Sequence, residues 1–280
     1  MGLLIGADPE FALVHKIRPG EEHLERGINA DRIINDQGSR FGCDGYSATA
    51  EIRPEPASSP QELIKHCYEC FYEGLEKTNA GMYAWKAGSY VTGKNLGGHI
   101  HFNHRPMGES FYYALDNILS IPLALLEDPE ERQRRIHNFG QFHSWRDQTW
   151  GIEYRTPASW LVSKGIAFGV ISIAFAIYYE FRKGSPTKTK IGNLGPVSQD
   201  TLGYRKKIPS IFKLIKGLSY FKKNKEALAG AFFIKQRINS KESWQNGQDI
   251  KERWGIKVYN GRRKVDPNIV WEKAMGGEWI

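Results

Sequence analysis

The 280-residue sequence contains only three cysteines, Cys43, Cys67 and Cys70. Three thiols do not make a disulfide framework, and their spacing does not match a four-cysteine zinc site. Cys67 and Cys70 lie three positions apart in a segment with helical character, so we interpret them as reduced structural residues. Because the N-terminus also lacks the basic flank and cleavage site of a signal peptide, we expect a cytoplasmic protein.

The common nucleotide-binding loops are absent as well. No G-x-G-x-x-G fingerprint occurs, and the segment Gly88 to Asn95, GSYVTGKN, only approximates the pattern G-x4-G-K-[ST]. Asn95 stands where a hydroxyl is required, and the residues that follow predict a strand rather than a helix. We therefore exclude a phosphate loop of that kind.

Long hydrophobic runs are limited to one, from Gly165 to Phe181. This run would cross a bilayer only if Lys164 and Glu180 reached the two interfaces. A fully buried helix in a globular core explains the same residues with less strain. We expect no membrane partner.

Acidic residues become scarce in the second part of the chain. Residues 1–182 carry 18 basic and 23 acidic side chains, whereas residues 183–264 carry 20 basic and 5 acidic ones. This change predicts a boundary near Gly184-Ser185-Pro186, between a catalytic sheet domain at 1–182 and a basic, partly helical region at 183–280 that completes or extends it. The basic surface is either simply solvated or attracts an anionic partner.

Strands outnumber helices in the pattern of apolar residues. Strands are predicted at 3–14, 32–41, 49–54, 82–91, 98–103 and 152–156, and helices at 60–78, 108–126 and 165–181. The helix at 60–78 has a capping serine, Ser59, a proline at its first position and Glu62 placed to complete a capping box. Simple alternation would give fewer strands, so we predict an α+β fold, with an antiparallel sheet and helices packed on one face.

Four of these segments place two chemically active side chains with one residue between them. The pairs are Asp8 and Glu10 in GADPEF, Glu51 and Arg53 in AEIRP, His99 and His101 in GGHIHF, and Glu153 and Arg155 in GIEYRTP. Side chains two apart on a strand point to the same face. A single polar pair is ordinary on a solvated sheet, but such faces favour Thr, Lys and Ser. Four pairs of acids, histidines and arginines therefore predict one shared site.

The chemistry of these pairs indicates a metal site that handles phosphate. Several carboxylates packed together repel one another and raise each other's pKa, which divalent cations relieve. Oxygen-rich ligation with an occasional imidazole suits Mg²⁺ or Mn²⁺. A guanidinium binds phosphate or carboxylate through two parallel hydrogen bonds. Together these groups favour phosphoryl transfer.

In their order and spacing, GADPEF, AEIRP, GGHIHF and GIEYRTPAS resemble the motifs of the phage-type carboxylate-amine ligases, or type 2 amidoligases. The catalytic domain of that family is related to glutamine synthetase and glutamate-cysteine ligase. The resemblance covers roughly residues 1–181. It implies a glutamine synthetase-like antiparallel sheet, ATP and Mg²⁺ as cofactors with Mn²⁺ as an alternative, and small-molecule or peptide carboxylate and amine substrates.

The resemblance also implies roles for the paired residues. The implied metal ligands are Asp8, Glu10, Glu51, His99 and Glu153. His101 is implied as an ATP contact and Arg155 as a phosphate-facing arginine. Arg53, beside Glu51, is a candidate for holding the substrate carboxylate.

A looser similarity involves the segment RRIHNFGQFHSWR, which precedes the last motif. Arg135, Gly140 and Arg146 match the family's approach to that strand, implying a nucleotide contact for Arg135 and a catalytic role for Arg146. Ordinary surface arginines are the alternative for both. Asn138-Phe139 and His143 depart from the pattern, because Tyr and Gly are more usual at these positions.

The implied reaction forms an amide at the expense of ATP. The substrate carboxylate attacks the γ-phosphorus to give an acyl phosphate, and an amine then displaces phosphate, so that ADP and phosphate are released. The amine must be deprotonated, and Glu55 and Asp44 are candidate bases only through their proximity to the motifs. The acid, the amine and the oligomeric state are left open by the sequence.

Two other functions remain open at this point. A metal-dependent hydrolase or phosphatase would use the same cluster of acids and histidines. A basic nucleic-acid-binding protein is the other alternative, because aromatic residues interleave with the lysines and arginines of the C-terminal region, namely Tyr204, Tyr220, Trp244, Trp254 and Tyr259. No RRM, KH or zinc-finger signature accompanies them.

Overall fold

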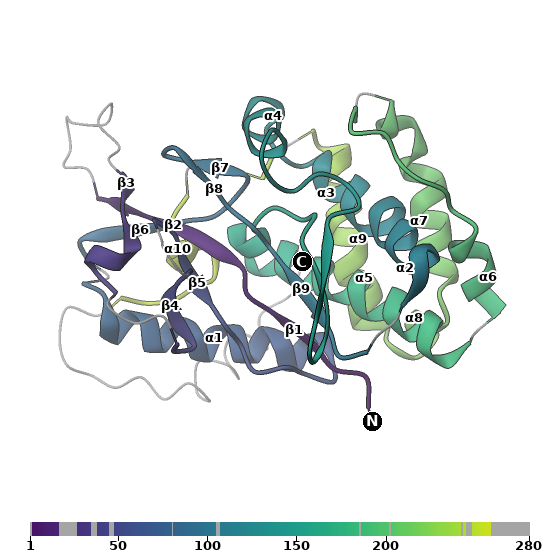
Figure 1. The fold of residues 1–280 in the computed structure, drawn as a ribbon, viewed down its shortest axis with the longest axis horizontal. Coiled ribbons are helices and arrows are strands. Elements are labelled where there is room, and N and C mark those ends of the chain that lie inside the picture. The colour runs from purple at the N-terminus through teal and green to yellow at the C-terminus, as the bar shows by residue number, and fades with distance from the viewer. Residues whose placement is uncertain are drawn as a thin grey trace.

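The computed structural model describes residues 2–16, 27–34, 38–44, 48–79, 81–104, 107–184, 186–201, 203–241, 243–244 and 248–258. In these residues the strands gather in one half of the molecule, with helix α1 (Pro60–Lys77) alongside them, and most other helices form the second half (Figure 1). All strand pairings are antiparallel. The predicted α+β class with antiparallel pairing is therefore confirmed.

The strands form two main sheets rather than the single sheet that the sequence predicted. The first has the order β1-β9-β11-β10, formed by Ile5–Ala7, Ile100–Phe102, Gly151–Tyr154 and Trp145–Gln148. The second has the order β3-β2-β5-β4, formed by Gly27–Ile28, Glu10–His15, Ala50–Ile52 and Phe41–Cys43, and β6 (Tyr83–Lys86) also pairs with β2.

The chain passes from the first sheet to the second at Pro9. Pro9 has no N–H, so it cannot continue the ladder as a donor, and the predicted strand at 3–14 is divided there into β1 and β2. Hydrogen bonds continue on both sides, from Asp8 N to His99 O at 3.4 Å and from Glu10 N to Gly97 O at 2.8 Å. The acidic pair of GADPEF therefore lies at the junction of the two sheets.

The segment from Gly88 to Asn95 contains a tight turn. The segment that resembled a phosphate loop is a hairpin of β7 (Tyr90–Val91) and β8 (Lys94–Asn95), with φ of 46° and 86° at Thr92 and Gly93. The prediction that this segment is not a phosphate loop is therefore confirmed.

The strand predicted at 32–41 is wrong. The described part of this segment contains the end of a 3-10 turn, η1 (Ala30–Arg32), and only the first residue of β4. Ile34 follows that turn and is buried. An apolar residue at this position therefore packs into the core without belonging to a strand.

Helix α1 begins and ends close to its predicted limits. Ser59 Oγ accepts a hydrogen bond from Glu62 N at 3.2 Å, and Glu62 Oε2 accepts one from Ser58 N at 2.7 Å, one residue before the expected capping-box partner. The apolar stripe predicted for this helix consists of Leu63, Cys67, Cys70, Phe71 and Leu75. The first four are buried and Leu75 is partly buried, and the helix contacts β4 and β5.

The helix predicted at 108–126 is divided by a π-helical turn. Helix α2 (Gly108–Leu115) leads into η2 (Asp116–Ser120), and α3 (Ile121–Ala124) follows. Ile121 N–H bonds to Asp116 O, five residues earlier, and the next residue is a proline without an N–H. The proline accounts for the break in regular helical bonding.

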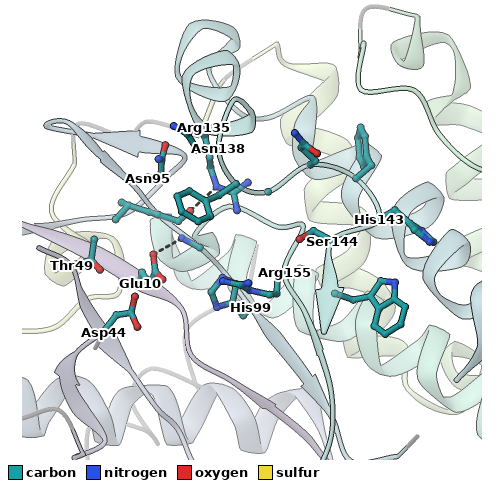
Figure 2. Close-up of a pocket in the computed structure, with 17 residues that line it drawn as sticks. Glu10, Asp44, Thr49, Asn95, His99, Arg135, Asn138, His143, Ser144 and Arg155 are labelled. Carbon is teal, nitrogen blue, oxygen red and sulfur yellow. Dashed lines mark hydrogen bonds between the residues drawn. The ribbon is translucent and has the colours of Figure 1, made fainter. Parts of the chain in front are cut away.

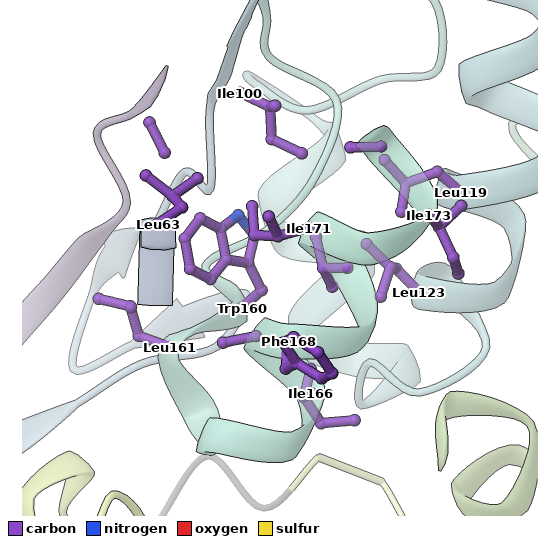
Figure 3. Close-up of a cluster of buried hydrophobic side chains, with 14 of the residues drawn as sticks. Leu63, Ile100, Leu119, Leu123, Trp160, Leu161, Ile166, Phe168, Ile171 and Ile173 are labelled. Atoms are coloured by element: carbon purple, nitrogen blue, oxygen red, sulfur yellow. The ribbon is translucent and has the colours of Figure 1, made fainter. Parts of the chain in front are cut away.

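The long apolar segment forms helix α5 (Lys164–Lys183), which is capped by Ser163 and ends at Gly184 with φ of 60°. By length and composition it is able to cross a membrane, but 83% of its apolar window is buried inside the protein. Figure 3 shows Trp160 packed among side chains that include Leu63 of α1, Ile100 of β9 and Ile171 of α5. The prediction of a buried core helix is confirmed.

The residues after Gly184 form helices α6 (Pro186–Gly192), α7 (Ile208–Gly217), α8 (Ser219–Lys223), α9 (Lys225–Asn239) and α10 (Ile250–Arg253). Helix α9 packs closely on α5. The contact leaves no space for a side chain at Gly169, where a Cβ would lie 2.5 Å from Gly230 O. Trp244, Trp254 and Tyr204 are buried in the core that also contains the sheet residues. These aromatic side chains are therefore not available to stack on nucleic-acid bases.

Candidate active site

A cavity of about 610 Å³ opens where β2 meets the loop that precedes β9 (Figure 2). Glu10, Asp44 and Thr49 line one end, and Ser144 and His143 line the other. The remaining lining residues are Asn95, Leu96, Gly97, His99, Arg135, Asn138, Phe139, Gly140, Gln141, Phe142, Trp145 and Arg155.

Strand pairing brings the sequence pairs together beside this cavity. His101 lies opposite both Gly6 and Glu153, Glu10 lies opposite Glu51, and Arg146 lies opposite Glu153. Asp8 Oδ1 lies 3.1 Å from His99 Nδ1 and 3.2 Å from His101 Nε2. Residues separated by more than 140 positions in the sequence thus share one site, as the four pairs predicted.

Two groups among the described residues have the composition and spacing to hold a metal ion. Asp8, His101 and Glu153 offer ligand atoms within 4.8 Å of one another, and Glu10, Asp44 and Glu51 do the same. The sequence prediction placed His99 rather than His101 among the ligands and did not include Asp44. The sequence suggested Asp44 only as a candidate base, because it lies just after β4, outside the four paired motifs.

Three carboxylates of these groups, Glu10, Glu51 and Asp8, have shifted pKa values. Burial, with smaller contributions from Asp44 and Asp8, raises the pKa of Glu10 to about 6, although His99 and Gly97 act against it. Burial and the nearby Asp8 charge raise the pKa of Glu51 to about 9. For Asp8, burial acts to raise the pKa, but His101 and His99 outweigh it and hold the pKa below its usual range. Without a cation, Glu51 is therefore costly to ionise at neutral pH.

Both histidines lie against these acids. Burial acts to lower the pKa of His99, but its contacts with Asp8 and the charges of Glu10 and Glu153 raise it overall. His99 lines the cavity, and the exposed ring of Trp150 lies 4.7 Å from the ring of His101. His101 Nε2 faces Asp8, and Glu153 Oε1 faces Arg155 Nε; these contacts are ion pairs without hydrogen-bond geometry.

Glu153 is surrounded by donors from two strands. Its Oε2 accepts hydrogen bonds from Arg146 Nε at 2.5 Å and Gln148 Nε2 at 2.8 Å, and its Oε1 lies 3.2 Å from Arg155 Nε. Arg155 lines the cavity, whereas the side chain of Arg146 is 55% exposed and is not among the lining residues. The two arginines therefore hold Glu153 from opposite sides, and Arg155 alone of them borders the cavity.

Arg53 binds the backbone of the neighbouring loop. Its Nη1 donates to Ser39 O at 2.7 Å and its Nη2 to Cys43 O at 2.8 Å, and Nη2 also pairs with Glu51. These contacts fix the end of β4 next to Glu51. The Arg53 guanidinium thus mainly holds this backbone and Glu51 in place.

Arg135 is fully enclosed by backbone. Its guanidinium donates to the carbonyl oxygens of Leu96, Thr156 and Pro157 at 2.9, 3.1 and 2.8 Å, and burial lowers its pKa to about 10. Gly140, with φ of 69°, packs so closely on it that a Cβ would lie 1.8 Å from Arg135 Nη1. The guanidinium joins three chain segments in the wall of the cavity. The nucleotide contact expected from the sequence stays a prediction.

The candidate bases Glu55 and Asp44 occupy different places. Asp44 lines the cavity, but Glu55 is exposed and does not. A third acid that sequence analysis missed, Asp116, is fully buried and bonded to His143 in the cavity wall. No sequence motif marks Asp116, because it lies in the π-helical turn η2.

One known protein family matches most of the chain. The family described as phage phiEco32-like COOH.NH2 ligase-type 2 matches residues 5–256. The chain belongs to this family. The resemblance carried by the four motifs is therefore confirmed, and it identifies the protein as an enzyme of the carbon-nitrogen ligase class. The match includes the cavity and most of the helices that follow residue 183.

Other comparisons add little to the family assignment. No curated protein matches the sequence. Among solved structures, the ligase chain is similar to a bifunctional glutathione synthetase from Pasteurella multocida, with a TM-score of 0.44 and 10% sequence identity. That similarity covers 91% of this chain and 51% of the other, so the chain spans about half the length of that protein. At this TM-score we draw no conclusion from the similarity.

Proposed function

We propose that the protein is an ATP-dependent carboxylate-amine ligase that forms an amide through an acyl phosphate and releases ADP and phosphate. The observation that supports this most directly is the group with metal-binding spacing that brings Glu10 and Asp44 into the lining of the cavity that Arg155 also borders. The other group adjoins the cavity through His99, which contacts Asp8 and Glu153. Membership of the COOH.NH2 ligase family supports the same reaction class.

The residues present fit divalent cations. Glu10 and Glu51 have raised pKa values because they are buried near other acids, so bound cations would relieve an unfavourable cluster. Asp8, His101 and Glu153 would hold one ion, and Glu10, Asp44 and Glu51 a second. Mg²⁺ or Mn²⁺ bound there would neutralise charge on the phosphate oxygens of ATP.

The histidines receive roles opposite to those expected from the sequence. We assign His101 to the metal-binding group, because its Nε2 lies within reach of Asp8 and Glu153. His99 borders the cavity and is therefore the better candidate for an ATP contact.

Arg155 is the candidate for stabilising the transferred phosphoryl group, since it borders the cavity and its ion pair with Glu153 engages only Nε. Arg146 orients Glu153 from the other side. Arg53 positions Glu51, and Arg135 shapes the nucleotide wall through the carbonyls of Leu96 and Pro157.

In the proposed reaction, an oxygen of the substrate carboxylate attacks the γ-phosphorus of ATP, and ADP leaves. The amine nitrogen then attacks the carbonyl carbon of the acyl phosphate, and the bond from carbon to the phosphate oxygen breaks. His99 and Arg155 line the cavity in which both steps would take place. This chain's residues contribute mainly orientation and charge stabilisation.

We also propose that residues 183–280 complete the catalytic domain. Helix α9 packs on α5, and Trp254 Nε1 donates to Leu161 O at 2.7 Å, so the described part of this region closes the core beneath the catalytic sheet. The burial of Trp244 and Trp254 disfavours the alternative of a nucleic-acid-binding surface built on stacking.

ADP release from MgATP in the presence of a panel of carboxylic acids and amines tests the proposal. Wild type is expected to need both an acid and an amine, and Glu10→Gln should reduce turnover by at least about 10²-fold. Glu76→Gln, an exposed acid on α1, is the matched control and should keep full turnover. ATP hydrolysis that needs neither substrate would instead favour the metal-dependent hydrolase.

A further inference from the structure

Asp116 and His143 form a hydrogen-bonded pair in the wall of the cavity. Asp116 Oδ1 accepts hydrogen bonds from Tyr154 Oη at 2.5 Å and from His143 N at 3.0 Å, and its Oδ2 lies 3.2 Å from His143 Nδ1. Asp116 is fully buried, and His143 lines the cavity. Neither residue belongs to the metal-binding groups or to the arginines discussed above.

Unusual backbone conformations place both members of the pair. His143 has φ of 67°, in the left-handed region that glycine adopts freely and that costs other residues about 1–2 kcal/mol. Asp116 lies in the π-helical turn η2. Strained residues and π-turns concentrate at functional sites, where the side chain compensates for the backbone cost. A histidine at a glycine-favoured position therefore indicates that its imidazole is used.

The imidazole of His143 is held on its faces and at one nitrogen. Its ring stacks on Tyr113 with centroids 4.8 Å apart, and Tyr112 meets it edge-on at 5.9 Å. Its Nε2 lies 2.8 Å from Glu109 Oε2, but the Glu109 side chain is 60% exposed and able to swing away. Asp116 therefore fixes the ring, and Glu109 covers the one nitrogen that faces outward.

The hydrogen bonds also determine the tautomer. An ionised Asp116 only accepts hydrogen bonds, so Nδ1 of His143 carries the proton that points to Asp116. Nε2 has a free electron pair once Glu109 has taken up the proton shared between them and moved aside. This is the state that a proton acceptor requires.

The pair is joined to the strand that carries the catalytic candidates. Tyr154, which donates to Asp116, lies between Glu153 and Arg155, and Arg155 N donates to Ser144 O at 2.8 Å. His143 is thus next in sequence to the residue that pairs with Arg155. Figure 2 shows His143 at the end of the cavity opposite Glu10 and Asp44.

We propose that His143 accepts the proton of the substrate ammonium group and that Asp116 is its positioning residue. This inference rests on the ligase function proposed above. The proton that Nε2 shares with Glu109 Oε2 passes to that carboxylate, which moves away as the neutral acid. An N–H bond of the ammonium then breaks as a new bond from Nε2 to hydrogen forms. The electron pair stays on the amine nitrogen, which attacks the acyl phosphate carbonyl, and phosphate leaves with the electrons of the broken C–O bond. Asp116 balances the resulting imidazolium.

The substitution Asp116→Asn changes the tautomer with little change in shape. Tyr154 Oη and His143 N both donate to Oδ1, so that atom must remain the amide oxygen, and the new NH₂ group faces His143 Nδ1. Nδ1 must then accept, and Nε2 carries the proton and no longer accepts one. His143→Gln removes the proton acceptor directly.

Hydroxylamine separates proton acceptance from the rest of the reaction. It is largely unprotonated near neutral pH, whereas an aliphatic ammonium such as that of lysine has a pKa of about 10. Wild type and variants are compared with MgATP, the most active acid of the panel, and either hydroxylamine or the most active aliphatic amine. Asp116→Asn and His143→Gln should lower the ratio of amide to hydroxamate formation by about 10²-fold or more.

Gln199→Ala provides the matched control, because Gln199 Oε1 holds Phe142 N at 3.0 Å and so supports the same loop without contacting the His143 ring. Its ratio should equal that of wild type even if both rates fall. The inference is overturned if the ratio is unchanged in Asp116→Asn and His143→Gln, or changes equally in Gln199→Ala. Absence of any turnover in wild type would overturn the ligase function and this inference with it.

Discussion

At the scale of single residues, the site is shaped by carboxylates that burial holds near their neutral form. The pKa of Glu51 rises from its ordinary value of 4.5 to about 9 through burial and the neighbouring Asp8 charge. Between these values the folded, metal-free protein binds a proton that the unfolded chain releases. The free energy of unfolding therefore falls as pH rises through this window.

Glu51→Gln should consequently stabilise the metal-free protein, and increasingly so from about pH 5 to about pH 8. Each kcal/mol gained raises Tm by roughly 2–4 °C. Thermal unfolding at a series of pH values, with chelator and then with Mg²⁺, measures the effect. Mg²⁺ should stabilise wild type more than the variant, because the variant lacks a ligand oxygen. A difference between the two proteins that does not depend on pH would contradict the account.

A second residue-scale prediction concerns Gly140, which has φ of 69° and lies against Arg135. An added methyl group costs about 1–2 kcal/mol for the backbone conformation and also displaces the Arg135 guanidinium from Thr156 O. Gly140→Ala should therefore lower the free energy of unfolding by about 3 kcal/mol. It should also weaken MgATP binding, because the cavity wall moves.

Gly184→Ala is the control, since Gly184 has φ of 60° but a Cβ there meets nothing within 4 Å. Only the conformational cost of about 1–2 kcal/mol is expected, with MgATP affinity unchanged. Urea unfolding and MgATP titration of both variants supply the comparison. Equal losses of stability at the two positions would show that the contact with Arg135 carries no energy.

At the scale of elements, the packing of α9 on α5 joins the C-terminal region to the core. A Cβ at Gly169 would lie 2.5 Å from Gly230 O, so Gly169→Ala forces the two helices apart and should lower Tm by several degrees. Gly217→Ala at the end of α7 meets nothing within 4 Å and should be neutral or slightly stabilising. Thermal unfolding of the two variants tests the opposite signs. A neutral Gly169→Ala would mean that α9 moves freely on α5.

Local signals in the sequence were enough to predict several elements. The cap at Ser59, the stripe of Leu63, Cys67, Cys70 and Phe71, and the long apolar run of α5 are each encoded within one segment. The strand predicted at 32–41 was wrong because Ile34 is buried from a turn. The division of 108–126 was missed because an inserted π-turn leaves the apolar periodicity almost unchanged.

The sequence predicted the residues of the candidate site that lie on strands. It did not predict the contributions that come from loops and turns. Residues such as Asp8 and His101 follow the two-residue period of strands, so their common face was visible in the sequence. Asp44 and Asp116 lie in a loop and a π-turn, whose positions depend on tertiary packing. The backbone carbonyls that occupy Arg53 and Arg135 likewise leave no trace in the pattern of side chains.

At the scale of the whole molecule, the two halves of the chain share one hydrophobic core while their charges differ. The excess of basic residues after residue 183 lies in helices whose apolar faces, including Ile215 and Ile234, are buried in that core. Apart from the buried Lys251, the described basic side chains of this region are exposed or partly exposed. The difference in charge between residues 1–182 and 183–264 is therefore a property of the surface. It does not indicate a second hydrophobic core.

The central claim is that the carboxylate substrate is activated by phosphorylation, and oxygen-isotope transfer tests it most directly. The acid that supports turnover is labelled with oxygen-18 in its carboxylate and incubated with MgATP, amine and wild-type protein. Because the carbon-oxygen bond of the acyl phosphate breaks when the amine attacks, we predict one labelled oxygen in each phosphate released. Phosphate without label, formed at the same rate as ADP, would contradict the acyl phosphate and with it the proposed ligase mechanism.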